Sequence, residues 1–271
     1  MNIQWFPGHM AKAKRLLKQK LKFVNLIVEI LDARVPFSSM SSDLVGLTFS
    51  KPKLVLLSKF DLANEAATKC WLSYFRDVGL IALAVNLKSG QGLENFSSIA
   101  KSLLNKKKSE KIKVLVCGVP NVGKSLFINK VTEKKRAKVE NRPAVTKGIS
   151  WFVGKNGLEF LDTPGILCPK FDDPKVGEKL AFIGSIKDNL FDSVSLCERL
   201  LQILLKNYKN AVENRFKVDL SFTTAQEALR KIGRKRGAII YGGKIDLNRV
   251  SNLILEEFRA GKITKITLEN S

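Results

Sequence analysis

Short apolar runs rich in branched side chains alternate with amphipathic stretches along roughly the first 160 residues. The runs that are typical of buried strands in a parallel sheet lie at 24–31, 54–57, 80–85 and 112–117. Two further runs, 151–153 and 158–161, flank a turn-forming Gly-Lys-Asn-Gly segment, which predicts a β-hairpin. The alternation predicts an α/β fold with a doubly wound, mostly parallel sheet and a ligand at the carboxyl ends of its strands.

The pattern changes at residue 175 to helical periodicity alone. Helices are predicted around 176–186, 193–205, 225–232 and 247–260. We therefore predict two domains, an α/β domain over 1–174 and a C-terminal all-helical domain over 175–271. A length of 271 residues is sufficient for two such cores.

The composition is that of an ordinary globular protein, with 45% apolar and 27% charged residues. No apolar run approaches the roughly 18 residues of a membrane span, and the N-terminus lacks the apolar core of a secretory signal. The four cysteines form no CxxC pair, so the sequence indicates neither a zinc site nor a disulfide framework. We expect a cytoplasmic protein that does not associate with membranes.

A formal net charge of +22 is the second global feature. Lys and Arg cluster at 12–22, 106–108, 134–136 and 230–236. A positive field of this size attracts polyanions, and nucleic acid is the most abundant polyanion in a cytoplasm. The alternative is that these runs only form solvated, soluble faces.

A phosphate-binding motif follows the fourth predicted strand. The octapeptide GVPNVGKS at 118–125 matches GxxxxGK[ST] and lies between a strand and a helix, as that motif requires. Its glycines let backbone N–H groups close around phosphates. Lys124 is expected to bridge the β- and γ-phosphates, and the Ser125 hydroxyl to ligate Mg²⁺. The other residues of this segment expected to contact nucleotide are Asn121, Val122, Gly123 and Leu126.

Two further elements of a phosphate site follow. The tetrapeptide DTPG at 162–165 comes directly after the predicted hairpin. There Asp162 is expected to hold the metal, and the Gly165 N–H to sense the γ-phosphate. Between the two motifs, Thr146 is placed to add a second hydroxyl to Mg²⁺ and is predicted, like Lys124, to take part in catalysis.

The candidate base reader lies upstream of the phosphate motif. SKFD at 58–61 resembles the NKxD motif, with Ser58 at its first position. The Asp61 carboxylate would accept from the N1–H and the exocyclic amine of guanine, and the Lys59 stem would stack along the base. Ala84 and Asn86 end the next strand, where GTPases place the loop that reads guanine O6. A solvated helix cap at Asp61 is the alternative interpretation.

The motifs therefore run in a rotated order, with the base reader before the phosphate loop. A site depends on spatial geometry and not on chain order, so a circular permutation leaves it intact. The sequence resembles the circularly permuted GTPases of the ribosome biogenesis GTPase A type over nearly its whole length. Besides the GTPase motifs, the resemblance rests on WFPGHM at 5–10, DARVP at 32–36 and FRAGK at 258–262. Ser58 and Ala144 replace the usual asparagine and glycine.

The resemblance implies a GTPase that binds GTP and GDP and promotes maturation of the large ribosomal subunit in bacteria. It implies that the helical domain binds ribosomal RNA within the subunit precursor, and we expect a monomer away from the ribosome. Asn121 would help to bind K⁺. The residue after DTPG is Ile166, which cannot orient water as the glutamine of Ras-like GTPases does. The resemblance gives that catalytic role to His9, the only histidine, whose alternative role is packing.

Two other functions stay possible on the sequence alone. A small-molecule kinase would share Lys124 and Ser125 but would need an acceptor pocket and a lid, for which we identify no residues. A nucleic-acid-binding protein with a regulatory or vestigial nucleotide site would fit the charge.

Overall fold

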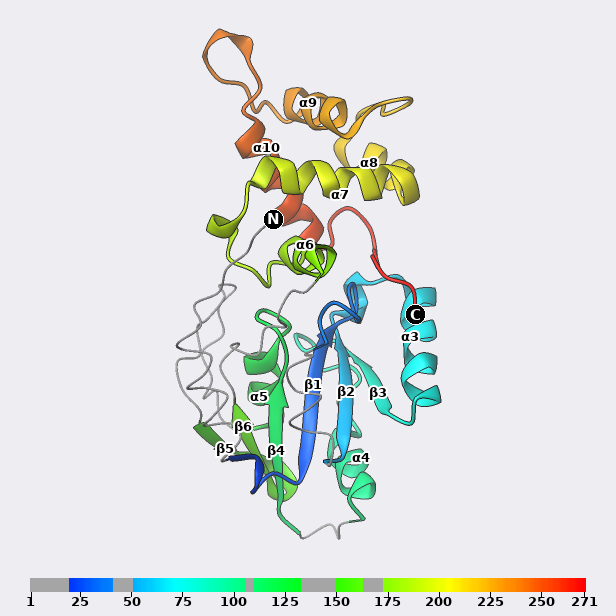
Figure 1. Ribbon diagram of the computed structural model, residues 1–271, viewed down its shortest axis with the longest axis vertical. Coiled ribbons are helices and arrows are strands. Elements are labelled where there is room, and N and C mark those ends of the chain that lie inside the picture. The colour runs from blue at the N-terminus through cyan, green and yellow to red at the C-terminus, as the bar shows by residue number, and fades with distance from the viewer. Residues whose placement is uncertain (1–19, 41–50, 106–109, 133–149, 163–172) are drawn as a thin grey trace.

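A computed structural model describes residues 20–40, 51–105, 110–132, 150–162 and 173–271. Within them, a six-stranded sheet has the order β3-β2-β1-β4-β6-β5 (Figure 1). Its strands are β1 (Leu26–Asp32), β2 (Lys53–Ser58), β3 (Ile81–Val85), β4 (Ile112–Cys117), β5 (Ser150–Val153) and β6 (Leu158–Asp162). All neighbours pair in parallel except β5, which is antiparallel to β6. The predicted mostly parallel α/β fold is confirmed.

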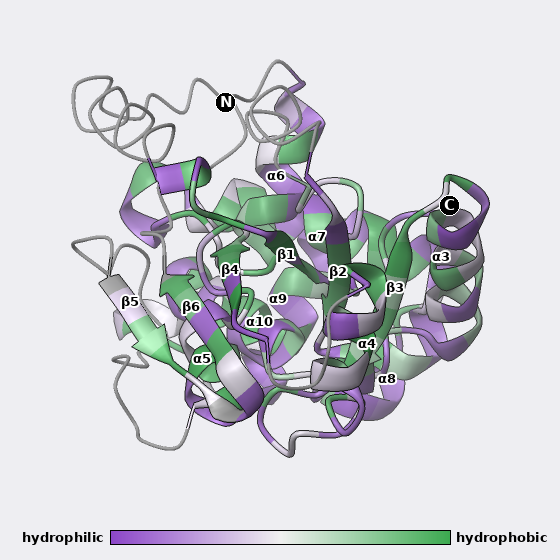
Figure 2. Cartoon of the chain, turned by 90° about the horizontal axis from the view of Figure 1, so that it is seen from below, coloured by the Kyte–Doolittle hydropathy of each residue, from purple (hydrophilic) through white to green (hydrophobic). Residues whose placement is uncertain are grey.

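The central strand β1 shows why the sheet forms. It pairs with β2 on one side and β4 on the other, and all seven of its residues are buried. A parallel strand covered on both faces is expected to be apolar almost throughout, and the central strands are mostly hydrophobic (Figure 2). The one acidic residue within the apolar run, Glu29, forms an ion pair with Lys53 at the start of β2.

Helices cover both faces of the sheet. Helices α4 (Phe96–Leu103) and α5 (Lys124–Val131) pack on one face, where Phe96, Phe127 and Phe160 meet edge to face with ring centroids 5.0 and 5.7 Å apart. Helix α3 (Glu65–Asp77) packs on the opposite face against alternate residues of the strands. In the predicted hairpin, Asn156 and Gly157 both adopt positive φ, as an Asn-Gly turn requires.

Helices follow one another after residue 173. They are α6 (Pro174–Phe182), α7 (Ser193–Asn207), α8 (Lys209–Phe216), α9 (Ala225–Lys235) and α10 (Leu247–Arg259). Helix α7 packs against both α9 and α10, and the group lies at one end of the molecule (Figure 1). The pattern predicted no helix at 209–216, because Val212 and Phe216 are its only buried residues. None of the described helices is long and apolar enough to cross a membrane.

The predicted helix at 176–186 is shorter in the structure, because α6 stops at Phe182. Gly184 takes a φ of +75° there, and its N–H donates to Ala181 O at 3.0 Å. The Ser185 N–H donates to Leu180 O at 2.9 Å, which completes a Schellman cap. The chain turns at this glycine towards the phosphate loop.

The last residues of the chain return to the sheet. The N–H groups of Ile266 and Leu268 donate to Leu62 O and Arg34 O at 3.0 and 2.8 Å. The buried Glu269 carboxylate accepts from the N–H and hydroxyl of Ser38 and pairs with Lys179 at 2.9 Å. The C-terminal segment 260–271 therefore connects the helical part to the loop after β1.

We predict that Glu269→Gln lowers the free energy of unfolding by about 1–3 kcal/mol, because a buried hydrogen-bonded carboxylate loses its charge beside Lys179. Urea denaturation measures this. The matched control is Glu65→Gln, which removes an exposed carboxylate paired with Lys69 and should cost at most about 0.5 kcal/mol. Equal losses in the two variants would show that the C-terminal segment contributes no special stability.

Candidate nucleotide-binding site

Loops from the carboxyl ends of neighbouring strands meet at a cavity of about 800 Å³. Its walls carry Lys59 and Asp61 after β2, Asn86 after β3, and Asn121 and Gly123 after β4. Val122 and Leu126 also line it. The volume is within the usual range for small-molecule sites, and the position is the one that doubly wound folds use for ligands. The base-reading and phosphate motifs are therefore brought together.

The helical part forms part of the cavity wall. Ile183, Gly184 and Ile186 line it from the segment after α6, and Arg259 and Ala260 line it from the end of α10. A ligand that fills the cavity therefore touches both the sheet loops and the helices.

The glycines of the phosphate loop adopt backbone conformations that side-chain-bearing residues rarely adopt, and each lies close to a neighbour. Gly118 has a φ of +144°, and a Cβ there would lie 2.3 Å from Ile30 O. Gly123 has a φ of +107°, and a Cβ there would lie 2.7 Å from Leu87 Cδ1. Helix α5 begins directly after Gly123, so its N-terminal N–H groups face the loop. This close backbone turn at a helix N-terminus is suited to bind phosphate.

Lys124 lies within the phosphate loop. Its ammonium donates to Gly118 O at 2.9 Å and to Val119 O at 2.8 Å. The side chain is buried, and neither it nor Ser125 lines the cavity. The loop therefore holds the ammonium beside the backbone that is expected to wrap the phosphates.

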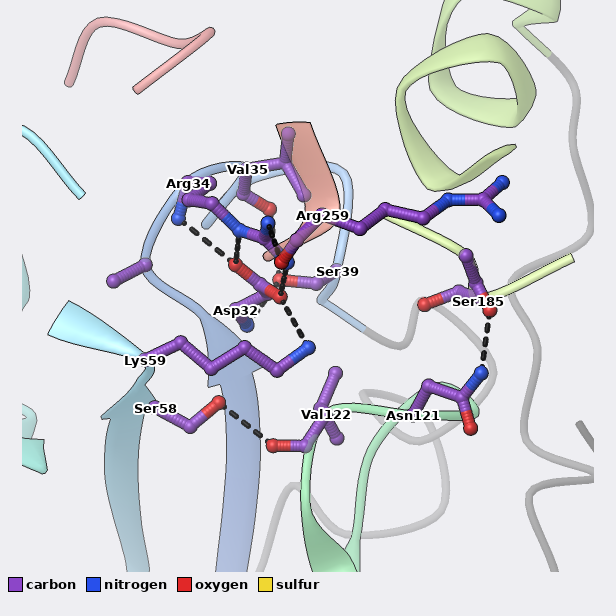
Figure 3. Close-up of polar contacts among 12 residues, drawn as sticks. Asp32, Arg34, Val35, Ser39, Ser58, Lys59, Asn121, Val122, Ser185 and Arg259 are labelled. Carbon is purple, nitrogen blue, oxygen red and sulfur yellow. Dashed lines mark hydrogen bonds and ion pairs between the residues drawn. The ribbon is translucent and has the colours of Figure 1, made fainter. Parts of the chain in front are cut away.

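Ser58 connects three elements, which explains why a small hydroxyl residue fits the first position of the base-reading motif. Its Oγ lies 2.8 Å from Leu31 O of β1. It also lies 2.7 Å from Val122 O of the phosphate loop, a contact drawn in Figure 3. A hydroxyl has one proton, so it donates to one of these carbonyls at a time. Ser58 is fully buried and holds the loop after β2 against the phosphate loop.

Lys59 is held by an ion pair. The residue adopts a left-handed conformation with a φ of +58°, and its ammonium lies 2.9 Å from Asp32 Oδ2. The Arg34 guanidinium binds the same carboxylate through two nitrogens, at 2.9 and 2.8 Å (Figure 3). Asp32 thus connects the loops after β1 and β2.

The electrostatics of this cluster favour the ionised carboxylate. Burial alone would raise the pKa of Asp32, but the charges and hydrogen bonds of Arg34 and Lys59 hold it well below its usual range. Burial lowers the pKa of Lys59, and the Asp32 carboxylate opposes that shift. Asp32 therefore stays charged throughout the physiological range and fixes both cations.

The predicted base-reading residues lie on ordered turns. Asp61 is half-buried in a 3-10 turn (Phe60–Leu62) and makes no hydrogen bond with the described residues. The Asn86 side chain accepts from the N–H groups of Lys88 and Ser89 at 2.9 and 3.2 Å, which shapes the loop after β3. Ala84 does not line the cavity, but Gly92 packs so closely on its carbonyl that a Cβ would lie 2.2 Å away.

Arg34 and Arg259 form a connection that the sequence motifs do not reveal. Arg34 donates to Phe258 O and Arg259 O at 3.4 and 3.1 Å, at the end of α10. Arg259 donates in turn to Ala181 O and Phe182 O at 2.8 and 3.1 Å, at the end of α6. Each guanidinium satisfies terminal carbonyls at the negative end of a helix. These two arginines belong to the segments DARVP (32–36) and FRAGK (258–262), for which the sequence offered only the family resemblance.

A second connection joins the phosphate loop to the helical part. The Ser185 hydroxyl donates to Pro120 O at 2.6 Å, and the Asn121 amide nitrogen donates to Gly184 O at 2.6 Å (Figure 3). Ser185 is buried. The phosphate loop and the Schellman turn after α6 therefore form one hydrogen-bonded unit.

Other predicted site residues lie outside the described residues, namely His9, Thr146 and Gly165. Asp162 ends β6 beside Val116 of β4, two residues before the phosphate loop, but its side chain is also outside the described part. Within the described part, no group of three or more His, Cys, Asp or Glu side chains could hold a metal ion.

The chain is similar in sequence to known GTPases. A family model described as a 50S ribosome-binding GTPase matches residues 113–232. The chain is 40% identical to the ribosome biogenesis GTPase A of Bacillus cereus, over 99% of this chain and 94% of that protein. It is 34% identical to the ribosome biogenesis GTPase A of Thermotoga maritima, over 98% of this chain and 94% of that one.

Solved structures share the fold. The GNP-bound crystal structure of YlqF from T. maritima matches with a TM-score of 0.70 and 30% identity, over 96% of this chain and 98% of that one. The GDP-bound structure of the T. maritima protein gives a TM-score of 0.69 over 94% and 99% of the two chains. With this similarity along nearly the full length, the chain belongs to the ribosome biogenesis GTPase A family.

Proposed function

We propose that this GTPase binds GTP and GDP in the cavity between the sheet loops and the helices, and acts on a precursor of the large ribosomal subunit. The observation that carries the proposal is the meeting of the base-reading loop, the phosphate loop and the helical part around one cavity. The family favours a ribosome-assembly GTPase over a nucleic-acid-binding protein with a vestigial nucleotide site.

Guanine recognition is proposed for Asp61, with the loop of Ala84 and Asn86 beside it. The Asp61 carboxylate lines the cavity and has no hydrogen-bond partner among the described residues, so guanine N–H donors would satisfy it. The Lys59 stem lines the same cavity, while Asp32 holds its ammonium. That arrangement supports stacking of the stem along the base.

Mg²⁺ is proposed to bind Ser125, Thr146 and Asp162. These residues offer only oxygen donors, which Mg²⁺ prefers. When bound, Mg²⁺ would neutralise the negative charge that develops on the phosphates during transfer. K⁺ is proposed at Asn121, whose side-chain amide is oriented by Gly184 O.

If Asn121 helps to hold K⁺, the rate of GTP hydrolysis in potassium should exceed the rate in sodium. Equal rates in the two salts would contradict the K⁺ site.

The proposed roles in hydrolysis follow from the sequence motifs and, for Lys124, also from its contacts in the phosphate loop. In the structure, the Lys124 ammonium donates to two loop carbonyls. With nucleotide bound, it would turn to the β- and γ-phosphates, while the N–H groups of the loop would bind the remaining phosphate oxygens. His9 would orient the attacking water, because Ile166 cannot. Thr146 and Gly165 would respond to the γ-phosphate.

The proposed partner is ribosomal RNA of the large-subunit precursor, bound through the helical domain 175–271. The net charge of +22 and the ribosome-related names of the relatives support this. We also propose that the protein works in the cytoplasm, where bacterial ribosomes assemble, and that it is a monomer away from them.

The proposed function is tested by GTP turnover and co-sedimentation without subunits, with large subunits and with small subunits. Large subunits should bind the protein more tightly with GTP than with GDP and should raise turnover. Small subunits serve as the control for charge alone. If large subunits neither bind the protein nor change its turnover, the proposed partner is wrong.

We predict that Asp61→Asn shifts preference from GTP towards xanthosine triphosphate by about tenfold or more, because the amide presents a donor where guanine carries an amine. Competition binding of the two nucleotides measures this. Asp77→Asn, which changes an exposed aspartate of α3, is the matched control. Unchanged GTP preference in Asp61→Asn would remove this residue from the base site.

We predict that His9→Ala lowers kcat by about 10²- to 10⁴-fold with little change in GTP affinity. Single-turnover hydrolysis and nucleotide binding should be measured for the same preparations. His9→Gln, which keeps a side chain able to orient water, should recover part of the rate. A parallel loss of nucleotide affinity in His9→Ala would instead show that the histidine packs its segment.

A further inference from the structure

A hairpin between α9 and α10 carries exposed apolar side chains. Ile239 and Ile240 are about half exposed and Tyr241 is fully exposed, so three consecutive large residues face solvent. An exposed apolar group of this kind commonly marks an interaction site. The hairpin stands out at the end of the molecule opposite the sheet (Figure 1).

The base of this hairpin is firmly held. Ile239 and Ile245 form an antiparallel bridge, and the Ile240 N–H donates to Lys244 O at 2.9 Å. Ile245 packs on α9 at Gly233, where a Cβ would lie 2.5 Å from the isoleucine Cγ2. Tyr241 is therefore presented on a preorganised turn, which lowers the entropic cost of binding.

The surroundings of the hairpin are positively charged. The chain has no acidic residue from 228 to 245. The exposed cations of this stretch are Arg230, Lys231, Arg234, Lys235, Arg236 and Lys244. Arg236 stacks on Phe216 and lies 3.6 Å from Glu257, so it supports the fold. The side chains of Arg230, Arg234 and Lys235 form no hydrogen bond or ion pair with the described residues.

We propose that Tyr241 stacks on an unpaired base of RNA while Arg230, Arg234 and Lys235 contact the neighbouring phosphates. This rests on the proposed binding of ribosomal RNA and adds that the recognised element is single-stranded. The charge favours RNA over a protein partner, since phosphates neutralise these cations. A lone projecting ring matches an unstacked base, whereas duplex RNA keeps its bases stacked and offers mainly phosphates and 2′-hydroxyls.

The test compares binding of a single-stranded 12-nucleotide RNA and of its duplex by fluorescence anisotropy. Tyr241→Ala should weaken single-strand binding about 5- to 100-fold and leave duplex binding nearly unchanged, whereas Tyr241→Phe should bind like the parent. Phe222→Ala removes another fully exposed aromatic, outside the basic run, and should change neither. Tyr241 is fully exposed, so its loss should not disturb the core, and thermal melting checks that the variants fold.

A double variant, Arg234→Ala with Lys235→Ala, should weaken single strand and duplex alike and reduce the salt slope by about 2. If Tyr241→Ala binds the single strand like the parent, or if the parent does not bind it, the inference is overturned. If Tyr241→Ala loses binding to large subunits but still binds the single-stranded RNA like the parent, the inference is overturned in favour of a protein contact. A parent that fails to co-sediment with large subunits instead contradicts the proposed function, whatever the oligonucleotides show.

Discussion

The buried carboxylate of Asp32 is the interaction on which the arrangement of the site depends. An isolated charge in the interior would cost several kcal/mol, so it persists only with partners that compensate for lost hydration. Here Arg34 and Lys59 supply two cations. Arg34 extends the network to the end of α10, and Lys59 belongs to the loop after β2, where guanine recognition is proposed. One buried charge thus holds the loop after β2 and the helical part in register.

This network also clarifies how a GTPase site assembles from motifs in rotated order. Strands β1 and β4 lie side by side in the middle of the sheet, although the paired residues Leu26 and Val114 are 88 positions apart in the chain. The phosphate loop after β4 therefore lies next to the loops after β1 and β2. Ser58 demonstrates the result directly, because its hydroxyl reaches carbonyls of both β1 and the phosphate loop.

Much of this fold could be predicted from local pattern. The apolar runs located all six strands to within a few residues, and the predicted phosphate motif lies between a strand and a helix, as expected. The end of α6 was missed because Gly184 acts through φ, which periodicity does not show. The roles of Arg34, Arg259 and Glu269 could not be predicted, because their partners lie tens to hundreds of residues away in the sequence. The segment 260–271 has no regular periodicity, since it is held by single contacts to several elements.

Helix α10 connects the two ends of the helical part. It begins at the base of the hairpin between α9 and α10, where Asp246 is its N-cap. It ends with Arg259 at the cavity. Its 13 residues span about 20 Å as a single rigid element. A nucleotide that changes the contacts of Arg34 or Arg259 therefore acts on the same element that carries the hairpin. By thermodynamic reciprocity, a partner bound at the hairpin must then alter nucleotide affinity by the same factor as the nucleotide alters partner affinity.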